Sequence, residues 1–576
     1  MAKRRQRKPK SDEEKLLNNM RKKFSVHVVE IELMVLAQQG WLMQRIGEHL
    51  RIIRNTVLGQ LKKNYDQMVR TKAYKRIIRK YSQVCQLIDK AEKDKDQAAL
   101  EIHAAQKKEL DDKLQELRNR HNVTFEYARK YGEELRKKFS LPDAVTVLTV
   151  CEMAWHSIEG LLFRNANNVY FYNRDNMITF QGKQAERCII LKRDPINGRF
   201  HVSFNGMDFP LIVKQDDLYV QETLAHIANY LDHGLEMDRQ NIELFKLGLP
   251  LISTYRICNN RIVRREIRGK IRYYLQIVLE GKPVPRRKKD GTIRHAYGQG
   301  RIGGDIGTQS LAIVGRDIVT LKNLAERSPD TFAYERKIHR WQRYMDRSRR
   351  ATNPDNYNPD GTFRKGGKVW VYSKRYKKAR AKVREMHRKA ADSRKYAHNE
   401  EVNRLRAIAD QLVIETMDIQ ALQKRAGEAT VNPRTSRFNR RKRFGKSIGK
   451  RSPGYFIKQG KYRFDSSGGC VKEVNTWKFK ASQYDHILHD TNKKQLSMRW
   501  HELPDGTRVQ RDLYSAFLLY CSDDDLQKPD KDKCDSSFGE FLKLHGACID
   551  EIKASGKVVM NSGIKFGIKK KRTKIS

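Results

Sequence analysis

Apolar residues recur every three or four positions over the first part of the chain, as in VEIELMVLAQQGWLMQRIGEHLRIIRNTVLGQL. This period predicts amphipathic helices. The charged stretch LIDKAEKDKDQAALEIHAAQKKELDDKLQELRNRH keeps a stripe of leucines, which predicts a long helix or a helical hairpin docked on its neighbours. We therefore expect a helical lobe over residues 28–163, preceded by a basic, mobile segment at 1–27.

In the next part of the chain the apolar residues recur at every second position. Alternating runs over 164–213 are separated by the turn signals Pro-Ile-Asn-Gly and Asn-Gly. A helical stretch follows at 217–247, and TYRICNNRIVRREIRGKIRYYLQIVLEG returns to strands. Residues 164–290 therefore predict a small antiparallel barrel or sheet. The basic segment 282–300 predicts a linker, and we place a domain boundary there.

A strand-rich segment opens the second half. Its apolar runs predict two or three strands, at Arg301–Thr308, Leu311–Val314 and Asp317–Leu321. A long basic helical hairpin is predicted over 332–410, with a disordered tip at ATNPDNYNPDGTFRKGGK. The next segment, QLVIETMDIQAL, predicts an apolar strand with Glu415 embedded in it.

The last part of the chain is more polar. Residues 423–466 are basic and predict irregular structure, after which CVKEVN predicts a strand. RDLYSAFLLYC predicts a helix with Asp512 in its first turn, where the helix dipole favours a carboxylate. Residues 522–576 predict a polar tail with a weak helix around Phe538–Leu544. The whole pattern indicates a multidomain α/β protein.

The charge of the chain points to a polyanionic partner. The 576 residues are too many for one hydrophobic core, so several domains are expected. Lys and Arg number 118 against 68 Asp and Glu, which gives a formal charge of +50. A compact protein with this surplus repels itself, and nucleic acid is the leading candidate to neutralise it. The alternative is a basic protein that coats nucleic acid without chemistry.

Other classes of protein fit the sequence poorly. No apolar run approaches the roughly 20 residues of a membrane helix, and the basic start MAKRRQRKPK is not followed by the apolar stretch of a signal peptide. The 8 cysteines are scattered and form no C-x-x-C pair. We therefore expect reduced thiols in a cytosolic protein.

Three acids stand in unusual settings: Asp305 in an apolar strand, Glu415 near the end of a later strand and Asp512 at a helix start. A buried, unpaired carboxylate is costly, so something positive should neutralise it. Singly, such an acid is more often a cap or an ion-pair partner. In this order the set matches an RNase H-like nuclease, whose carboxylates hold two Mg²⁺ (or Mn²⁺) ions for phosphodiester hydrolysis. Gly307 is expected to give backbone room beside the site.

The motifs around these acids resemble those of a known superfamily. GGDIGTQSLAIVG resembles the first RuvC motif of transposon-encoded TnpB proteins and type V CRISPR effectors. LVIETMDIQAL resembles their second motif, and RVQRDLYSAFLL their third. YYLQIVLEG before the first motif and Ala481–Gln483 before the third also fit. The resemblance covers residues 265–520. Upstream it rests on architecture, with a helical recognition lobe inserted into a barrel-like wedge domain, which would start in the basic segment 1–27 and continue over 164–290.

The resemblance implies an RNA-guided, metal-dependent DNA endonuclease. Residues 301–480 would form its RuvC domain with the hairpin 332–410, and 511–521 its last motif helix. A guide, either a CRISPR RNA or a transposon-end RNA, would pair with target double-stranded DNA beside a short adjacent motif. The length suits an intermediate between the two, acting in the prokaryotic cytoplasm and on the nucleoid. Nucleic-acid contacts are expected from Arg511, Gln483, Lys480, Arg340, Arg343, Lys374 and Arg375.

Residues 481–510 depart from the family pattern, which has a zinc ribbon with two Cys pairs there. His486 and His489 keep an H-x-x-H spacing, and Glu502 and Asp505 fall near the second pair. The loss of four thiolates removes the strongest zinc ligands and disfavours zinc. A weak His and carboxylate site, or a ribbon held by packing alone, are the alternatives.

Two other functions compete with the guided nuclease. One is a guided DNA-binding protein without cleavage, which the presence of all three acids disfavours. The other is an unguided RNase H-like resolvase or transposase, which the +50 charge and the large upstream region disfavour. The sequence leaves the oligomeric state open.

Overall fold

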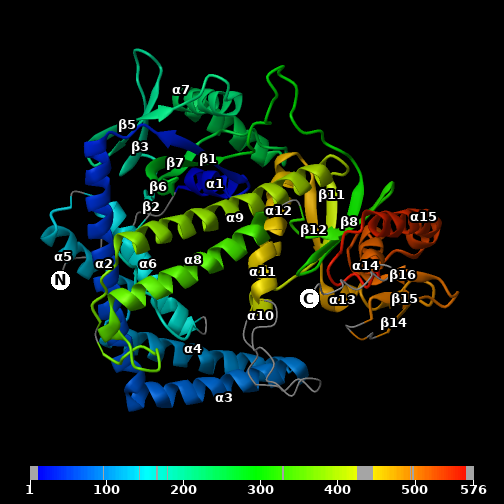
Figure 1. Cartoon of the computed structure of the whole chain (residues 1–576), viewed down its shortest axis with the longest axis horizontal. Helices are drawn as coiled ribbons and strands as arrows, with labels where there is room; N and C mark the ends of the chain where they lie inside the picture. The colour runs from blue at the N-terminus through cyan, green and yellow to red at the C-terminus, as the bar shows by residue number, and fades with distance from the viewer. Residues whose placement is uncertain are drawn as a thin grey trace, which may run out of the picture. The chain divides into compact units, whose positions relative to one another are not determined.

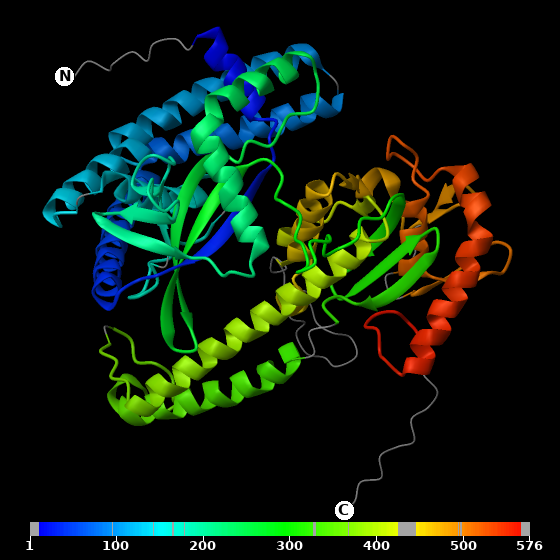
Figure 2. The ribbon, with the colours of Figure 1, turned by 90° about the horizontal axis from the view of Figure 1, so that it is seen from above.

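The computed structural model describes residues 11–565, except 95, 142, 164–165, 178, 327–329, 367, 424–444, 493–494 and 496–497. The chain divides into two compact units, Met1–Asp290 and Gly291–Ser576, whose elements are drawn in Figure 1 and Figure 2. The division lies inside the segment predicted to be a linker. Within the described ranges, no helix combines the length and apolar character that crossing a bilayer requires.

The first unit is built on an antiparallel sheet with the strand order β2-β6-β7-β1-β5-β4-β3. Its strands are β1 (Val26–Leu33), β2 (Thr179–Gln181), β3 (Ile189–Arg193), β4 (Phe200–Phe204), β5 (Met207–Ile212), β6 (Ile257–Ile267) and β7 (Lys270–Glu280). The alternating sequence pattern predicted this antiparallel pairing. Among the described residues no ladder joins β2 to β3, so the sheet stays open and does not close into the barrel that the sequence offered as an alternative.

Strand β1 (Val26–Leu33) corrects the prediction for residues 28–33, which placed them in the helical lobe. They form a central strand, paired with β7 on one side and β5 on the other. Alternate residues of VHVVEIEL are buried. Glu30 and Glu32 form ion pairs with Arg265 and Arg272 across the strands. The helical period of the residues that follow hid this period of two.

Helices make up the rest of the first unit. They are α1 (Asp12–Arg21), α2 (Ala37–Arg70), α3 (Lys72–Asp94), α4 (Gln97–Arg120), α5 (Phe125–Lys138), α6 (Ala144–Phe163) and α7 (Leu218–Lys246). Helix α1 lies in the segment expected to be mobile. Ser11 caps it by accepting a hydrogen bond from the backbone of Glu14, and Arg21 pairs with Asp238 of α7 at 2.8 Å. These contacts give α1 a fixed place on the unit.

The second unit is built on a mixed sheet with the order β10-β9-β8-β11-β12. Its strands are β8 (Arg301–Ile306), β9 (Ser310–Gly315), β10 (Ile318–Asn323), β11 (Gln411–Glu415) and β12 (Cys470–Val474). β8, β9 and β10 form an antiparallel meander, whereas β11 runs parallel to both β8 and β12. All five strands lie where the sequence predicted strands.

Helices cover both faces of this sheet. They are α8 (Asp330–Thr352), α9 (Lys374–Arg406), α10 (Ile419–Gln423), α11 (Gly445–Arg451), α12 (Pro453–Ser466), α13 (Thr476–Phe479), α14 (Arg511–Tyr520) and α15 (Lys531–Ser555). On one face, Val314 of β9 shares a buried cluster with Phe517 of α14. On the other, Leu412 of β11 shares a cluster with Leu405 of α9 and Phe456 of α12. Short hairpins add β13 (Tyr484–Asp485) with β14 (Asp490–Thr491), and β15 (Trp500–Glu502) with β16 (Arg508–Gln510).

Helix α15 corrects the prediction of a polar tail at 522–576. The helix is 25 residues long and runs beside the sheet (Figure 2). Phe541, Ile549 and Ile552 are at most 8% exposed and belong to the same core as α14. The apolar seam of α15 is narrow and set among charged residues, so the sequence shows only its centre.

The prediction of irregular structure at 423–466 is also wrong in part. Residues 424–444 lie outside the described part of the chain, whereas 445–466 form α11 and α12. Pro453 stands at the start of α12, where its missing N–H costs no hydrogen bond. Phe456 and Phe464 of α12 are buried in the core.

Helices α8 and α9 form the predicted basic hairpin (Figure 1). Its tip is folded, in contrast to the predicted disorder. The rings of Phe363 and Trp370 meet edge to face with centroids 5.7 Å apart, and the Arg349 guanidinium lies 5.3 Å from the Trp370 ring centre. The Asn353 side chain makes two hydrogen bonds with the backbone of Val371. The aromatic residues supply a small core that the polar turn composition concealed.

Candidate active site

Asp305 and Glu415 lie side by side on two neighbouring strands. The parallel register of β8 and β11 pairs Gly304 with Ile414. Asp305 and Glu415 are the next residue on each strand, so their side chains emerge on the same face of the sheet. The pairing of β8 with β11 therefore juxtaposes two carboxylates that are far apart in the sequence.

Helix α14 brings Asp512 to the same place because it packs directly on β8. A Cβ on Gly303 would lie 2.1 Å from the carbonyl oxygen of Ala516, so only glycine permits this approach. The sequence pattern predicts this backbone room at Gly307 instead. A Cβ there would meet the adjustable hydroxyl of Ser310 at 3.0 Å, so the close approach is at Gly303 and not at Gly307.

Asp512 is a buried carboxylate with weak contacts. Its side chain is 10% exposed. Oδ1 lies 3.4 Å from Nη2 of Arg511, and Oδ2 lies 3.5 Å from the Ser310 hydroxyl, both long for hydrogen bonds. Among the described residues, these two long contacts orient the carboxylate.

Glu415 is held by the backbone that follows β12. Its Oε1 accepts a hydrogen bond of 3.2 Å from the N–H of Ala481. Burial raises the pKa of Glu415, and the Ala481 bond lowers it in part. Ala481 begins the Ala-Ser-Gln stretch that resembles the family pattern, and it is the backbone N–H of Ala481 that contacts Glu415.

Asp305 has the most perturbed environment of the three acids. Burial raises the pKa of Asp305 well above its usual range, and the nearby Asp512 and Glu415 carboxylates raise it further. Arg511 and Arg499 oppose this shift. The three acids therefore interact electrostatically, with Asp305 as the member that both others repel.

The three acids suit a hard divalent cation in their chemistry. Carboxylate oxygens are the ligands that Mg²⁺ and Mn²⁺ prefer, and a cation would relieve the repulsion that raises the pKa of Asp305. In the part of the chain that the structure describes, no three His, Cys, Asp or Glu side chains stand close enough together to form a ready ligand cluster. The site thus has the donors and the charge for a cation, and its side chains would have to converge to hold one.

The two histidines considered as zinc ligands serve different purposes. His486 is 2% exposed, and its Nδ1 lies 2.7 Å from the Tyr514 hydroxyl inside an aromatic cluster. His489 is on an exposed turn, where it contacts Tyr484. Asp505 accepts hydrogen bonds from Thr507. Among the described residues these side chains do not form a ligand cluster.

The residues expected to contact nucleic acid fall into two groups. Arg340 and Arg343 on α8, and Lys374 and Arg375 on α9, are exposed along the hairpin. The second group lies near the carboxylates: Lys480 and Gln483 flank Ala481, and Arg511 pairs with Asp512. The Arg511 side chain is only 14% exposed, and in this structure its guanidinium pairs with the Asp512 carboxylate.

Two features of the site were missed by sequence reasoning. Arg499 directly precedes β15. Burial lowers the pKa of Arg499 most, and the Arg511 charge lowers it further, whereas the carboxylates of Asp512 and Asp305 raise it. Trp477 is 87% exposed on α13, the short helix between β12 and Ala481. Neither stands in a recognisable motif, and only the fold brings Arg499 to the carboxylates and α13 to the end of β11.

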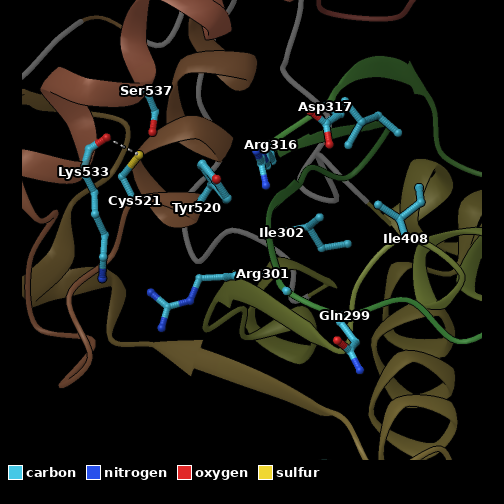
Figure 3. Close-up of a pocket in the computed structure, with 12 residues that line it drawn as sticks. Gln299, Arg301, Ile302, Arg316, Asp317, Ile408, Tyr520, Cys521, Lys533 and Ser537 are labelled. Carbon is cyan, nitrogen blue, oxygen red and sulfur yellow. Dashed lines mark hydrogen bonds between the residues drawn. The ribbon is translucent and has the colours of Figure 1, made fainter.

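A separate cavity of about 700 Å³ opens at the other end of β8 (Figure 3). Arg301, Arg316, Tyr520 and Lys533 are among its lining residues. Arg301 is engaged there by the backbone carbonyl of Ser522 at 2.6 Å. None of the three acids lines this cavity, so it is distinct from the carboxylate site.

Comparisons with known proteins give a partial structural likeness. No protein-family model matches the chain, and no curated protein matches it. A solved structure of a Cas12f1–sgRNA–target DNA complex aligns with a TM-score of 0.36 and 9% identity, covering 87% of this chain and 99% of that one. A Cas12i1 R-loop complex before target DNA cleavage aligns at 0.25 and 9%, covering 90% of this chain, which spans 65% of the length of that one. At such scores and identities, no residue role transfers from those proteins to this chain.

Proposed function

We propose that this chain is an RNA-guided DNA endonuclease whose phosphodiester hydrolysis depends on Asp305, Glu415 and Asp512. The observation that carries the proposal is that the parallel strands β8 and β11 pair Gly304 with Ile414, so that Asp305 and Glu415 follow at the same end of both strands. Asp512 on α14 raises the pKa of Asp305. Neighbouring carboxylates whose pKa is shifted by burial and by nearby charges are typical of a functional site. The RuvC-like motifs and the +50 charge support the guided, nucleic-acid-directed form of the proposal.

Each residue of the site has a defined task in this proposal. The three acids would hold the divalent cations, which when bound supply an activated water and stabilise the leaving oxygen. The Ala481 N–H holds Glu415 in place, and Ser310 and Arg511 orient Asp512. Arg499, which interacts with Asp305 and Asp512, contributes positive charge where a phosphate would enter.

The guide and the target account for the positive surfaces. An A-form guide–target heteroduplex is bound through its backbone, which requires cations rather than base-reading side chains. The exposed Arg340, Arg343, Lys374 and Arg375 on the α8–α9 hairpin fit that requirement. The guide would be a CRISPR RNA or a transposon-end RNA, and the target double-stranded DNA. We also propose that the chain is an evolutionary intermediate between TnpB proteins and type V CRISPR effectors.

The first test is to purify the protein from a host that carries its native flanking DNA and to sequence the bound RNA. A single abundant RNA with a constant scaffold supports guided action and also separates the CRISPR from the transposon case. RNA without a common scaffold would favour an unguided nuclease.

The second test is cleavage by the purified ribonucleoprotein. Asp305→Asn, Glu415→Gln and Asp512→Asn should each abolish cation-dependent cleavage, while binding of target DNA remains. Cleavage at wild-type rate by any of the three variants would contradict the assignment.

A guided DNA-binding protein without cleavage is the second candidate. The observation that favours it is that the three acids do not form a ready ligand cluster among the described residues. Sequence-specific binding by the wild-type ribonucleoprotein, with no cleavage in Mg²⁺ or Mn²⁺, would support this candidate.

A further inference from the structure

Trp477 is exposed on α13, a short helix whose neighbouring residues are bonded to the end of β11. The residue is 87% exposed, the most of the 6 tryptophans; the next, Trp41, is 59% exposed. A tryptophan normally buries most of its large apolar surface. Trp477 lies on α13, which directly follows β12, the strand next to β11 and its Glu415. An exposed tryptophan at this position calls for a partner.

Helix α13 is fastened to the strand that carries Glu415. The Thr476 hydroxyl donates a hydrogen bond of 2.8 Å to the carbonyl oxygen of Thr416. On the far side of the helix, the Ala481 N–H donates to Glu415 itself at 3.2 Å. Along the chain, Trp477 therefore lies between Thr476 and Ala481, which donate hydrogen bonds to Thr416 and Glu415.

The indole is presented outward by a short, capped helix. The Asn475 side chain accepts hydrogen bonds from the backbone N–H groups of Trp477 at 2.9 Å and of Lys478 at 3.3 Å, which caps the helix. Phe479 occupies the inward side of the helix and is 1% exposed. Lys480 ends the helix in a left-handed conformation. The exposure of Trp477 is thus built into the local fold.

Two lysines lie close to Trp477 in the chain, and Nζ of Lys478 is 3.4 Å from the side-chain oxygen of Gln527. Lys478 is exposed next to Trp477, and Lys480 follows after the buried Phe479. At the carboxylates, Arg499 and Arg511 offset the negative charge of Asp305. Single-stranded nucleic acid matches this combination, because its bases stack on aromatic rings and its phosphates seek cations. The second unit offers both within one short segment.

We propose that Trp477 stacks on a base of the DNA strand that enters the carboxylate site, and so positions the scissile phosphate between Asp305, Glu415 and Asp512. This inference rests on the proposed nuclease function. Trp477 would be a positioning residue, since it touches the strand and not the reacting atoms. Lys478 and Lys480 would hold the phosphates on either side of the stacked base.

The test compares three tryptophan variants in the guide-loaded ribonucleoprotein. Trp477→Ala should lower the single-turnover cleavage rate at subsaturating complex by about tenfold, the usual effect of losing one base stack. Trp477→Phe keeps an aromatic ring and should stay within about threefold of wild type. Trp477→Leu keeps apolar bulk without a ring and should behave like the alanine variant. Trp41→Ala, which removes an exposed tryptophan of the first unit, is the matched control.

A binding readout separates stacking from a structural effect. In the Asp305→Asn background, a short oligothymidylate should quench indole fluorescence, and Trp477→Phe should remove most of that quenching. Equal quenching in both proteins would overturn the inference. So would a wild-type cleavage rate in Trp477→Ala, or a change of oligomeric state in that variant, which would mark a protein-binding surface.

The outcomes also distinguish this inference from the proposed function. If Asp305→Asn abolishes cleavage and Trp477→Ala does not alter it, the nuclease assignment stands and the stacking role fails. If Asp305→Asn cleaves like wild type, the nuclease assignment itself fails.

Discussion

The backbone N–H of Gln510 donates a hydrogen bond of 3.0 Å to Nε2 of His545. Gln510 is the N-cap of α14, and its side-chain oxygen accepts a 2.8 Å hydrogen bond from the N–H of Leu513. Its side-chain amide donates to the carbonyl of Ser562 at 3.3 Å. The C-terminal segment thus fixes the residue from which the Asp512 helix begins.

This hydrogen bond predicts sensitivity to acid. Burial lowers the pKa of His545 to about 4, because the charged form is disfavoured in the core and the neutral ring must accept from Gln510. A lowered histidine pKa leaves stability intact above pH about 6.5 and removes it as the pH falls towards 4. Near pH 4 this group lowers the free energy of unfolding by about 3 kcal/mol relative to neutral pH. Thermal unfolding followed from pH 7 to pH 4.5 checks this.

His545→Leu should make that pH dependence shallower. At pH 7 the variant should be less stable by about 1–3 kcal/mol, because a buried N–H loses its acceptor. His339→Leu, which removes an exposed histidine on α8, is the control and should keep the wild-type pH dependence. An unchanged pH dependence in His545→Leu would show that other groups set the acid limit.

A side chain at residue 303 should separate α14 from the sheet. In Gly303→Ala the new Cβ would lie 2.1 Å from the carbonyl oxygen of Ala516, and backbone cannot move aside cheaply. We expect a stability loss of about 3 kcal/mol and loss of cleavage, since Asp512 moves with its helix. Gly449→Ala, where a Cβ meets nothing within 4 Å, should leave both nearly unchanged. Chemical denaturation and a cleavage assay of both variants decide the matter.

Removing divalent cations should reveal the repulsion among the acids. The raised pKa of Asp305 means that, in chelator, the folded state loses stability as the pH rises through that pKa. Asp305→Asn should therefore unfold at a higher temperature than wild type in chelator at neutral pH. Added Mg²⁺ should stabilise wild type and have much less effect on the variant. Equal stabilisation of both by Mg²⁺ would place the cation elsewhere.

The hairpin cations should set part of the salt dependence of RNA or DNA binding. Replacing Arg340, Arg343, Lys374 and Arg375 by Gln should weaken binding and reduce the slope of log affinity against log salt by about 3, if all four contact phosphates. The control replaces four exposed lysines of the second unit, Lys531, Lys543, Lys553 and Lys557, for the same change in charge. Equal slopes for the two variants would remove the hairpin from the binding surface.

Local sequence patterns were sufficient for most element types in the second unit. The apolar runs of β8, β9, β10 and β11 and the helix at Asp512 follow from periodicity, because neighbouring residues alone determine which face of an element is apolar. The same reasoning missed β1 and most of α15. In both, a narrow apolar pattern is masked by charged residues or by the period of the adjoining segment.

The sequence by itself determined the three acids, their order and the sign of the surrounding charge, because these are properties of residue types and of local pattern. The tertiary structure alone decided that β8 lies beside β11, that α14 approaches through Gly303, and that His545 supports Gln510. It alone also placed α13, the helix that carries Trp477, against Thr416, the residue after Glu415. Each of these relationships joins residues distant in the chain through close packing and hydrogen bonds, which no local period encodes.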